Sequence, residues 1–172
     1  KKNVRVMFEA SVAAGTPIIS PLLRDLLAND IDTIHGIING TTNYILTKMS
    51  EEGMDFATAL KEAQTLGYAE SDPSKDIEGI DAAYKMSILS TLAFHTRIED
   101  KDVYREGITR LTSRDFLYAK ELGYTIKLMA IANNHSGRIQ VRVHPTLVPS
   151  ECMMAKINGV LNAVEVQGDL IG

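Results

Sequence analysis

The 172-residue sequence predicts an α/β (α+β) fold, in which a mixed parallel and antiparallel sheet is covered by helices. Two patterns support this class. An apolar helical stripe over residues 18–27 lies between strand-like runs at 4–9 and 31–38, and this order favours a right-handed crossover. In the last third, strand-like and helix-like runs alternate as β-α-β-β-α-β. We expect an antiparallel segment beside the crossover unit, in one sheet.

Helix boundaries in the first half follow from single residues. Thr16 supplies an N-cap, and Pro17 follows at the first helical position. Asp55 caps a later helix, and Gly67 suits its C-terminal end. The helices expected here run from Thr16–Pro17 to Asn29, from about Asn43 to Met49, from Asp55 to Gly67 and from about Gly79 to His95. The last is apolar on most sides, so we expect it to be central.

A hairpin organises the last third. The segment Asn134-His135-Ser136-Gly137 lies between two runs that alternate apolar and polar residues, which is typical of two paired strands. The elements expected are a strand at 107–111, a helix from 112–115 to 123, strands at 125–133 and 138–147, a short helix near 151–157 and a strand at 160–166.

The composition is that of an ordinary globular protein, with 45% hydrophobic and 23% charged residues. Acids and bases are mixed around a net charge of −4, which gives no electrostatic footprint for nucleic acid. No apolar run approaches the ~20 residues of a membrane span and no signal peptide opens the chain, so we expect a cytoplasmic protein. The single cysteine, Cys152, excludes an internal disulfide and is expected to be a buried, inert thiol.

Both ends of the chain have few of the polar, turn-forming residues that usually flank a domain. The sequence opens directly in a strand-like run and stops at Gly172 without a polar tail. We therefore expect a single domain, residues 1–172, that is excised from a longer protein.

The most informative segment is acidic. It places five carboxylates within twelve residues, namely Glu70, Asp72, Asp76, Glu78 and Asp81. Like charges this close repel each other unless water, a cation or a cationic ligand relieves them, so a small cationic or hydroxylated substrate is one interpretation. The alternative is a polar turn in which Asp76 caps the following helix.

Asp81 and Lys85 are neighbours on that helix because they are four residues apart. They form either a solvent-exposed ion pair or the polar lining of a cleft, in which the lysine acts as acid or base. Spacing alone does not decide between these hypotheses.

Two further patterns bear on ligands. The turn Asn39-Gly40-Thr41-Thr42 could hold a carboxylate or phosphate on its amide groups, although many such turns bind nothing. The four histidines lack metal-ligand spacing, and both the dinucleotide fingerprint and the P-loop are absent from the sequence.

Four blocks in order resemble the substrate-binding, or catalytic, domain of homoserine dehydrogenase. They are residues 8–19, 36–45, 66–73 and 76–85, and the similarity runs over essentially the whole chain. The resemblance implies interconversion of L-homoserine and L-aspartate 4-semialdehyde with NAD(P), in the biosynthesis of threonine, methionine and isoleucine. It also implies a homodimer formed through the sheet.

The resemblance assigns roles to the acidic segment. Glu70 would hold the ammonium group of the substrate with help from Asp76. Asp81 and Lys85 would form the catalytic pair, with Lys85 near the oxygen that gains or loses a proton.

It also assigns residues near two helix starts. Gly40 and Thr41 would contact substrate or cofactor, with Gly40 at most an edge contact to the cofactor, and Tyr68 would pack beside them. A monovalent-cation site for sodium would be built mostly from main-chain oxygens, and its residues would be Glu9, Val12, Ala14 and Thr16. Oxygen ligands suit a hard cation.

One departure from the family pattern limits the prediction. The family carries an N-terminal Rossmann domain that binds the nucleotide, and this sequence lacks it. Without a held hydride acceptor we expect the chain alone to be inactive. Two alternatives remain, an oligomerisation scaffold and an amino-acid-binding regulatory module, neither of which requires Lys85.

Overall fold

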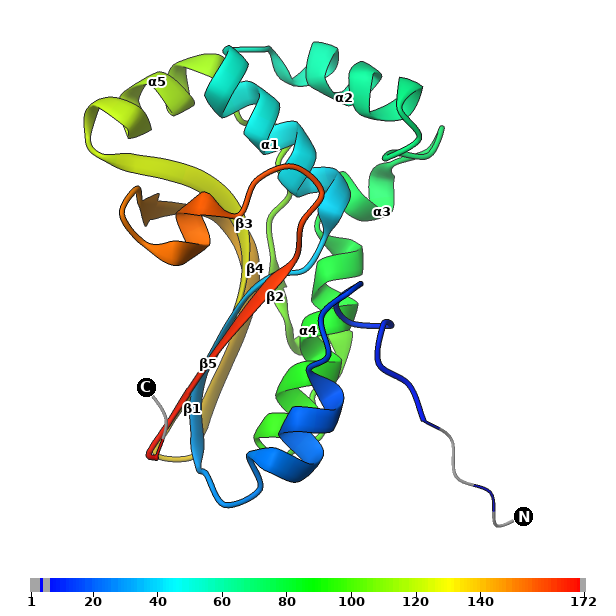
Figure 1. The fold of residues 1–172 in the computed structure, drawn as a ribbon, viewed down its shortest axis with the longest axis vertical. Helices are drawn as coiled ribbons and strands as arrows, with labels where there is room; N and C mark the ends of the chain where they lie inside the picture. Colours follow the sequence, from blue (N-terminus) through cyan, green and yellow to red (C-terminus); the bar gives the residue numbers. More distant parts are fainter. Residues whose placement is uncertain (1–3, 5–6, 171–172) are drawn as a thin grey trace.

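A five-stranded mixed sheet organises the computed structural model, which describes residue 4 and residues 7–170 (Figure 1). The strands are β1 (Ile31–Ile37), β2 (Tyr104–Arg105), β3 (Tyr124–His135), β4 (Arg138–Pro149) and β5 (Ala163–Gly168). Their spatial order is β2-β4-β3-β1-β5. Strands β2 and β4 are parallel, and the other neighbouring pairs are antiparallel. The predicted α/β class with a mixed sheet is confirmed.

The helical segments are distributed unequally over the sheet. They are η1 (Pro21–Asp25), α1 (Gly40–Glu52), α2 (Phe56–Thr65), α3 (Ser74–Ile77), α4 (Ile80–Ala93), η2 (Asp100–Asp102), α5 (Ser113–Glu121) and η3 (Met153–Lys156). Figure 1 shows η1 and α4 side by side along one face, with α1, α2 and α5 gathered at one end of the sheet. Among the described residues, no helix is long and apolar enough to cross a membrane.

Alternation along β3 divides the core between the two faces of the sheet. Leu128, Ala130 and Ala132 belong to the large cluster under the helices, whereas Met129 and Ile131 belong to a small cluster under η3. Helix α4 is buried on several sides against the large cluster, as its sequence predicted.

The predicted cap and C-terminal end of α2 and the predicted hairpin turn are confirmed. The Asp55 carboxylate accepts a hydrogen bond from the Thr58 N–H at 2.9 Å, and Gly67 ends α2 at a φ of 78°. Strands β3 and β4 pair up to His135 and Arg138. The hairpin turn uses positive φ at Ser136 (53°) and Gly137 (82°), which matches the right-handed twist of the strands. The elements follow one another as β2-α5-β3-β4-η3-β5, which matches the predicted β-α-β-β-α-β order except that the first strand lies at Tyr104–Arg105 and the second helix is a 3-10 segment.

The first predicted strand is wrong over residues 7–9, which form no strand, and residues 5 and 6 lie outside the described residues. The first helical segment is the π-helix η1, which follows a helical turn at Ile19 and Ser20 and does not begin at Pro17. The free N–H groups of Ile18, Ile19 and Ser20 donate to the Glu9 carboxylate, so Glu9 takes the capping role that was expected of Thr16. The described part of the sheet therefore begins at β1, without the crossover from residues 4–9.

The strand predicted at 107–111 is also wrong. This segment is a turn, and the pairing with β4 occurs at β2, two residues upstream. The reason is that the segment packs on the end of α3. The Ile108 N–H donates to the Ile77 carbonyl at 2.8 Å, and a Cβ on Gly107 would lie only 2.4 Å from the same oxygen.

The region after β4 differs in detail from its prediction. The helix expected near 151–157 is the shorter 3-10 segment η3, and the last strand begins at Ala163 instead of 160. Cys152 is exposed, contrary to the buried thiol expected. It precedes η3, whose Met154 and Ala155 supply the apolar contact with the sheet in its place.

Lys127 is a buried cation that the sequence patterns did not identify. It is 2% exposed, and its ammonium group donates to the carbonyl of Ile157 at 2.6 Å. Side-chain oxygens of Asn158 and Asn43 accept further bonds at 2.8 and 3.3 Å. Burial lowers the pKa of Lys127 to about 8, and the charge of Glu51 opposes that shift only in part.

The lowered pKa of Lys127 predicts a pH-dependent stability. Between about pH 8 and its ordinary 10.5, the unfolded chain keeps a proton that the folded chain has lost. The free energy of unfolding therefore rises with pH across this window, by up to roughly 3 kcal/mol from this group. In urea denaturation at pH 7.5, 9 and 10, we expect the free energy of unfolding of wild type to rise relative to that of Lys127→Met, by roughly 2 kcal/mol in all.

The matched control for this experiment is Lys120→Met, which alters an exposed lysine. Its unfolding free energy should run parallel to that of wild type at all three pH values. Parallel curves for Lys127→Met as well would contradict the prediction.

Candidate active site

The turn between β1 and α1 is built around the side chain of Asn39. This residue is the N-cap of α1, and its Oδ1 accepts from the Thr42 N–H at 2.9 Å and from the Thr42 hydroxyl at 3.0 Å. Asn39 is only 6% exposed. The cap thus fixes a buried amide group at the carboxyl end of β1.

The amide nitrogen of Asn39 joins two of the predicted acids. It donates to Asp76 Oδ1 at 2.7 Å and to Asp81 Oδ2 at 3.0 Å. Asp76 comes from α3 and Asp81 from the first turn of α4. Sequence patterns placed Asn39 in a turn but assigned it no role. Its capping role could have been predicted, because asparagine is a favoured N-cap and Asn39 directly precedes the first residue of α1.

Asp81 and Lys85 form the expected pair, with 2.6 Å between Asp81 Oδ2 and Lys85 Nζ. Their side chains are 30% and 22% exposed, which is too buried for an ordinary surface ion pair. Lys85 also donates to the main-chain oxygen of Ile38 at 3.1 Å. The pair is therefore partly buried and anchored at the end of β1, and its role in catalysis stays a prediction.

Glu70 does not join this network. Its side chain is exposed, and within the described residues its carboxylate has no hydrogen-bond or ion-pair partner. Its main-chain oxygen accepts from Gln64 Nε2 at 3.0 Å. Asp72 serves the turn, where bonds from the Ser74 hydroxyl and N–H lower the pKa of the Asp72 carboxyl. The acidic segment thus divides into a buried part around Asn39 and a solvent-facing part.

Tyr68 lies beside the start of α1, as expected. Its main-chain oxygen accepts from the Thr41 hydroxyl at 2.6 Å, and its ring centroid is 4.9 Å from that of Tyr44. The Tyr68 ring remains 44% exposed. Thr41 therefore ties the loop after α2 to the first turn of α1.

Gly40 has a structural reason to be glycine. A Cβ at this position would lie 2.8 Å from the carbonyl oxygen of Val160, in the segment before β5. Close packing of two backbones accounts for the residue without a ligand, so a contact of Gly40 with substrate or cofactor stays a prediction.

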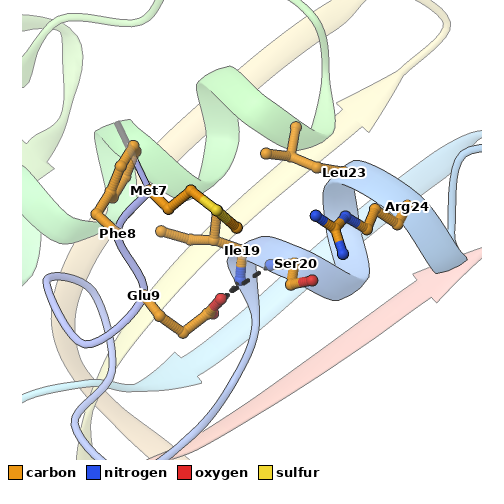
Figure 2. Close-up of a pocket in the computed structure, with 7 residues that line it drawn as sticks. All are labelled: Met7, Phe8, Glu9, Ile19, Ser20, Leu23 and Arg24. Carbon is orange, nitrogen blue, oxygen red and sulfur yellow. Dashed lines mark hydrogen bonds between the residues drawn. The ribbon is translucent and has the colours of Figure 1, made fainter. Parts of the chain in front are cut away.

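Glu9 lies in a separate place (Figure 2). Partial burial acts to raise its pKa, but the N–H groups of Ile18, Ile19 and Ser20 bind the carboxylate and lower the pKa of Glu9 overall. Glu9 borders a hollow of about 460 Å³. Figure 2 shows the side chains that line it, which are Met7, Phe8, Glu9, Ile19, Ser20, Leu23 and Arg24. None of these residues belongs to the Asn39 network.

The predicted cation site contains oxygens that are already engaged. Backbone donors occupy the Glu9 carboxylate, and the Ala14 carbonyl accepts from Asn162 Nδ2 at 3.2 Å. Within the described residues, no donor reaches the main-chain oxygens of Val12 and Thr16. The same part of the chain holds no cluster of three or more His, Cys, Asp or Glu arranged for a metal. The sodium site stays a prediction.

Comparison with known proteins adds evidence independent of this geometry. A family model described as homoserine dehydrogenase matches residues 17–172. The homoserine dehydrogenase of Neisseria gonorrhoeae is 54% identical over 172 residues, which cover 100% of this chain and 40% of that protein. The homoserine dehydrogenase of Pseudomonas aeruginosa is 50% identical with the same coverage.

Solved structures agree with the sequence relatives. The crystal structure of a homoserine dehydrogenase from Thiobacillus denitrificans superposes with a TM-score of 0.93 at 53% identity, over 96% of this chain and 38% of that one. A hyperthermophilic archaeal homoserine dehydrogenase in complex with NADPH gives a TM-score of 0.79 at 36% identity, over 96% and 46%. The chain spans about 40% of the length of the curated relatives. It belongs to the homoserine dehydrogenase family.

Proposed function

We propose that this chain is the substrate-binding and proton-transfer part of a longer enzyme that interconverts L-homoserine and L-aspartate 4-semialdehyde with NAD(P). The observation that carries the proposal is the Asp81–Lys85 pair, which is held by Asn39 and the Ile38 carbonyl in a chain of this family. In the experiments below, "the full-length protein" means that longer enzyme.

Reduction of the aldehyde requires a hydride on carbon and a proton on oxygen. The reduced cofactor NAD(P)H, held by a domain outside this chain, would supply the hydride and leave as NAD(P)+. The Lys85 ammonium donates the proton to the carbonyl oxygen as the C=O π bond breaks and the O–H bond forms. Oxidation of homoserine runs the same steps in reverse, with Lys85 taking the hydroxyl proton.

Asp81 orients this lysine. Its Oδ2 accepts from both Lys85 and the Asn39 amide, at 2.6 and 3.0 Å, so the carboxylate is fixed from two sides. The ammonium group of Lys85 is therefore directed by a carboxylate and by the Ile38 carbonyl at 3.1 Å. Two acceptors leave the third ammonium hydrogen for the substrate oxygen.

Asp76 and Glu70 would bind the substrate ammonium group. Asp76 Oδ1 accepts from Asn39, which leaves lone pairs of this carboxylate for a cationic group. Glu70 is exposed in the loop between α2 and α3 and is available to the substrate. The carboxylates of Asp76 and Glu70 would bind the ammonium group of the substrate, and Lys85 would bind its oxygen. These two contacts together would fix the orientation of the amino acid in the site.

The two alternatives make different demands on the acids and Lys85. A scaffold would leave Glu70, Asp81 and Lys85 exposed and apart. Asp81 and Lys85 pair and meet Asp76 through Asn39, whereas Glu70 lies outside this network. A regulatory module would bind homoserine without needing Lys85. Variants at Lys85 and Glu70 separate these functions.

Replacement of Lys85 tests proton transfer. In the full-length protein, we expect Lys85→Met to lower turnover of homoserine by about 10²- to 10⁴-fold, because the proton donor is lost. Homoserine binding in calorimetry should be retained, because the ammonium-binding acids remain. Lys75→Met, which changes an exposed lysine of α3, is the matched control and should leave turnover unchanged.

Replacement of Glu70 tests the other end of the substrate. We expect Glu70→Ala to weaken homoserine binding in calorimetry by about tenfold, which corresponds to the loss of one charge-assisted contact of about 1.4 kcal/mol. Unchanged turnover and binding in both Lys85→Met and Glu70→Ala would reject the catalytic assignment.

The chain by itself should not catalyse the reaction. Oxidation of homoserine needs a hydride acceptor beside the reacting carbon, and the chain by itself has no domain that would hold NAD(P) there. Much of the rate comes from holding both reactants in position, so binding homoserine alone is not enough. We expect no NAD(P)H formation, followed by absorbance, when the chain is mixed with L-homoserine and NAD(P). The full-length protein under identical conditions is the positive control. Measurable oxidation by the isolated chain would refute this expectation.

The homodimer expected from the family remains a proposal. Its support is the face of the sheet opposite α4, which η3 covers at one end only (Figure 1). Side chains such as His35, Arg142 and Glu165 are only partly buried there. Sedimentation of the full-length protein should give twice the protomer mass, and a monomer at micromolar concentration would contradict it.

A further inference from the structure

The side-chain amide of Asn39 has every hydrogen-bonding position engaged. Its oxygen accepts two bonds from Thr42, and its nitrogen donates one hydrogen each to Asp76 and Asp81. An asparagine amide offers two donors and two acceptor positions, so nothing is left over. The group is also buried, which makes each of these bonds costly to lose.

The direction in which this amide points is determined by the backbone. The Thr42 N–H can only donate, so it requires the amide oxygen. Rotating the amide by 180° would place its NH₂ against that N–H and its oxygen against two carboxylates. The cap of α1 therefore directs the NH₂ group toward Asp76 and Asp81.

The two acids belong to different helical segments of the chain. Asp76 lies in α3, Asp81 lies in α4, and Gly79 between them has a φ of 73°. Two carboxylates that share one donor are close enough to repel. The shared NH₂ group offsets this repulsion and holds α3 at a fixed position relative to α4.

We propose that Asn39 is the positioning residue that sets the separation between the ammonium-binding end and the proton-transfer end of the substrate site. This inference rests on the proposed function, since Asp76 serves one end and Asp81–Lys85 the other. Asn39 acts through these side chains and need not touch the substrate. A displacement of about 1 Å between the ends would cost up to about a hundredfold in rate.

Capping alone does not explain the choice of asparagine. Serine, threonine and aspartate cap helices about as well. Of these side chains, only asparagine also presents two N–H donors beside the accepting oxygen. The need to donate to both Asp76 and Asp81 therefore explains why residue 39 is an asparagine, which capping alone does not.

The decisive variant is Asn39→Asp in the full-length protein. It keeps the size and the cap, but it puts a third carboxylate against Asp76 and Asp81. We expect turnover to fall by about 30- to 100-fold at pH 8. Lowering the pH toward 6 favours uptake of one proton by the three-carboxylate cluster, against the opposing charge of the Lys85 ammonium beside Asp81, and that proton restores a donor. The ratio of variant to wild-type turnover should therefore rise by about fivefold.

Asn39→Ser separates lost donors from added charge. Serine still caps through its oxygen, but its side chain is too short to bridge both acids. We expect turnover to fall with a variant-to-wild-type ratio that does not change with pH. Asp55→Ala, which removes the cap of α2 away from the site, is the matched control for loss of a cap and should leave turnover unchanged.

The outcomes distinguish this inference from the function on which it rests. If Lys85→Met loses turnover while both Asn39 variants stay within threefold of wild type, the inference is overturned and the function stands. If Lys85→Met keeps turnover, the function fails and the inference falls with it. A pH-independent ratio for Asn39→Asp overturns the shared-donor role. Should Asn39→Asp fail to fold, Asn39→Ser decides, by losing turnover where Asp55→Ala does not.

Discussion

The hydrogen bond from the Thr42 N–H to Asn39 Oδ1 is the interaction on which the candidate site depends. It is an N-cap, which satisfies one of the free N–H groups in the first turn of α1 and stabilises the start of this helix directly after β1. The same bond directs the amide nitrogen of Asn39 toward the two acids. A local requirement of helix formation thereby orients groups from two other segments of the chain.

The Ile38 carbonyl completes this junction. It accepts from Lys85, while Asn39 next to it donates to Asp81, so two consecutive residues after β1 hold both members of the ion pair. Helix α4 is largely apolar and packed into the main core. Asp81 and Lys85 in its first turns face the end of β1, where Ile38 and Asn39 offer them partners. Desolvation of the pair is offset by these additional bonds.

On the other face of the sheet, the buried charge of Lys127 is likewise stabilised by hydrogen bonds that offset its desolvation. Its buried ammonium is surrounded by neutral oxygens of Asn43, Asn158 and the Ile157 carbonyl. These bonds hold the segment before β5 against α1, and Val160 in that segment packs on Gly40. The start of α1 is consequently fixed from two sides, by Asn39 within the turn and by this segment across it.

How much could be predicted depended on how local each feature is. Caps such as Asp55, the Ser136–Gly137 turn and the i,i+4 spacing of Asp81 and Lys85 involve neighbours in sequence, and each was correctly placed. The strand expected at 107–111 was wrong because its backbone bonds the end of α3. Errors at the first helix and at the single cysteine have a related cause. The first helix starts late because its cap, Glu9, lies nine residues or more before the N–H groups it accepts. Cys152 is exposed because Met154 and Ala155, and not the cysteine, pack against the sheet. Cys152, Met154 and Ala155 are all apolar, so the sequence does not show which of them is buried.

The sequence by itself determined the fold class, the family resemblance and the residue types of the site, because these are carried by periodicity, caps and ordered blocks. Only the tertiary structure decided that Asp76 and Asp81 meet at Asn39 while Glu70 stays in solvent. The contacts to Asn39 span 37 and 42 residues, and contacts of that separation arise from packing of whole elements. The acidic segment had the composition of a ligand site, but its division into buried and exposed parts depended on where α3 and α4 came to rest against β1.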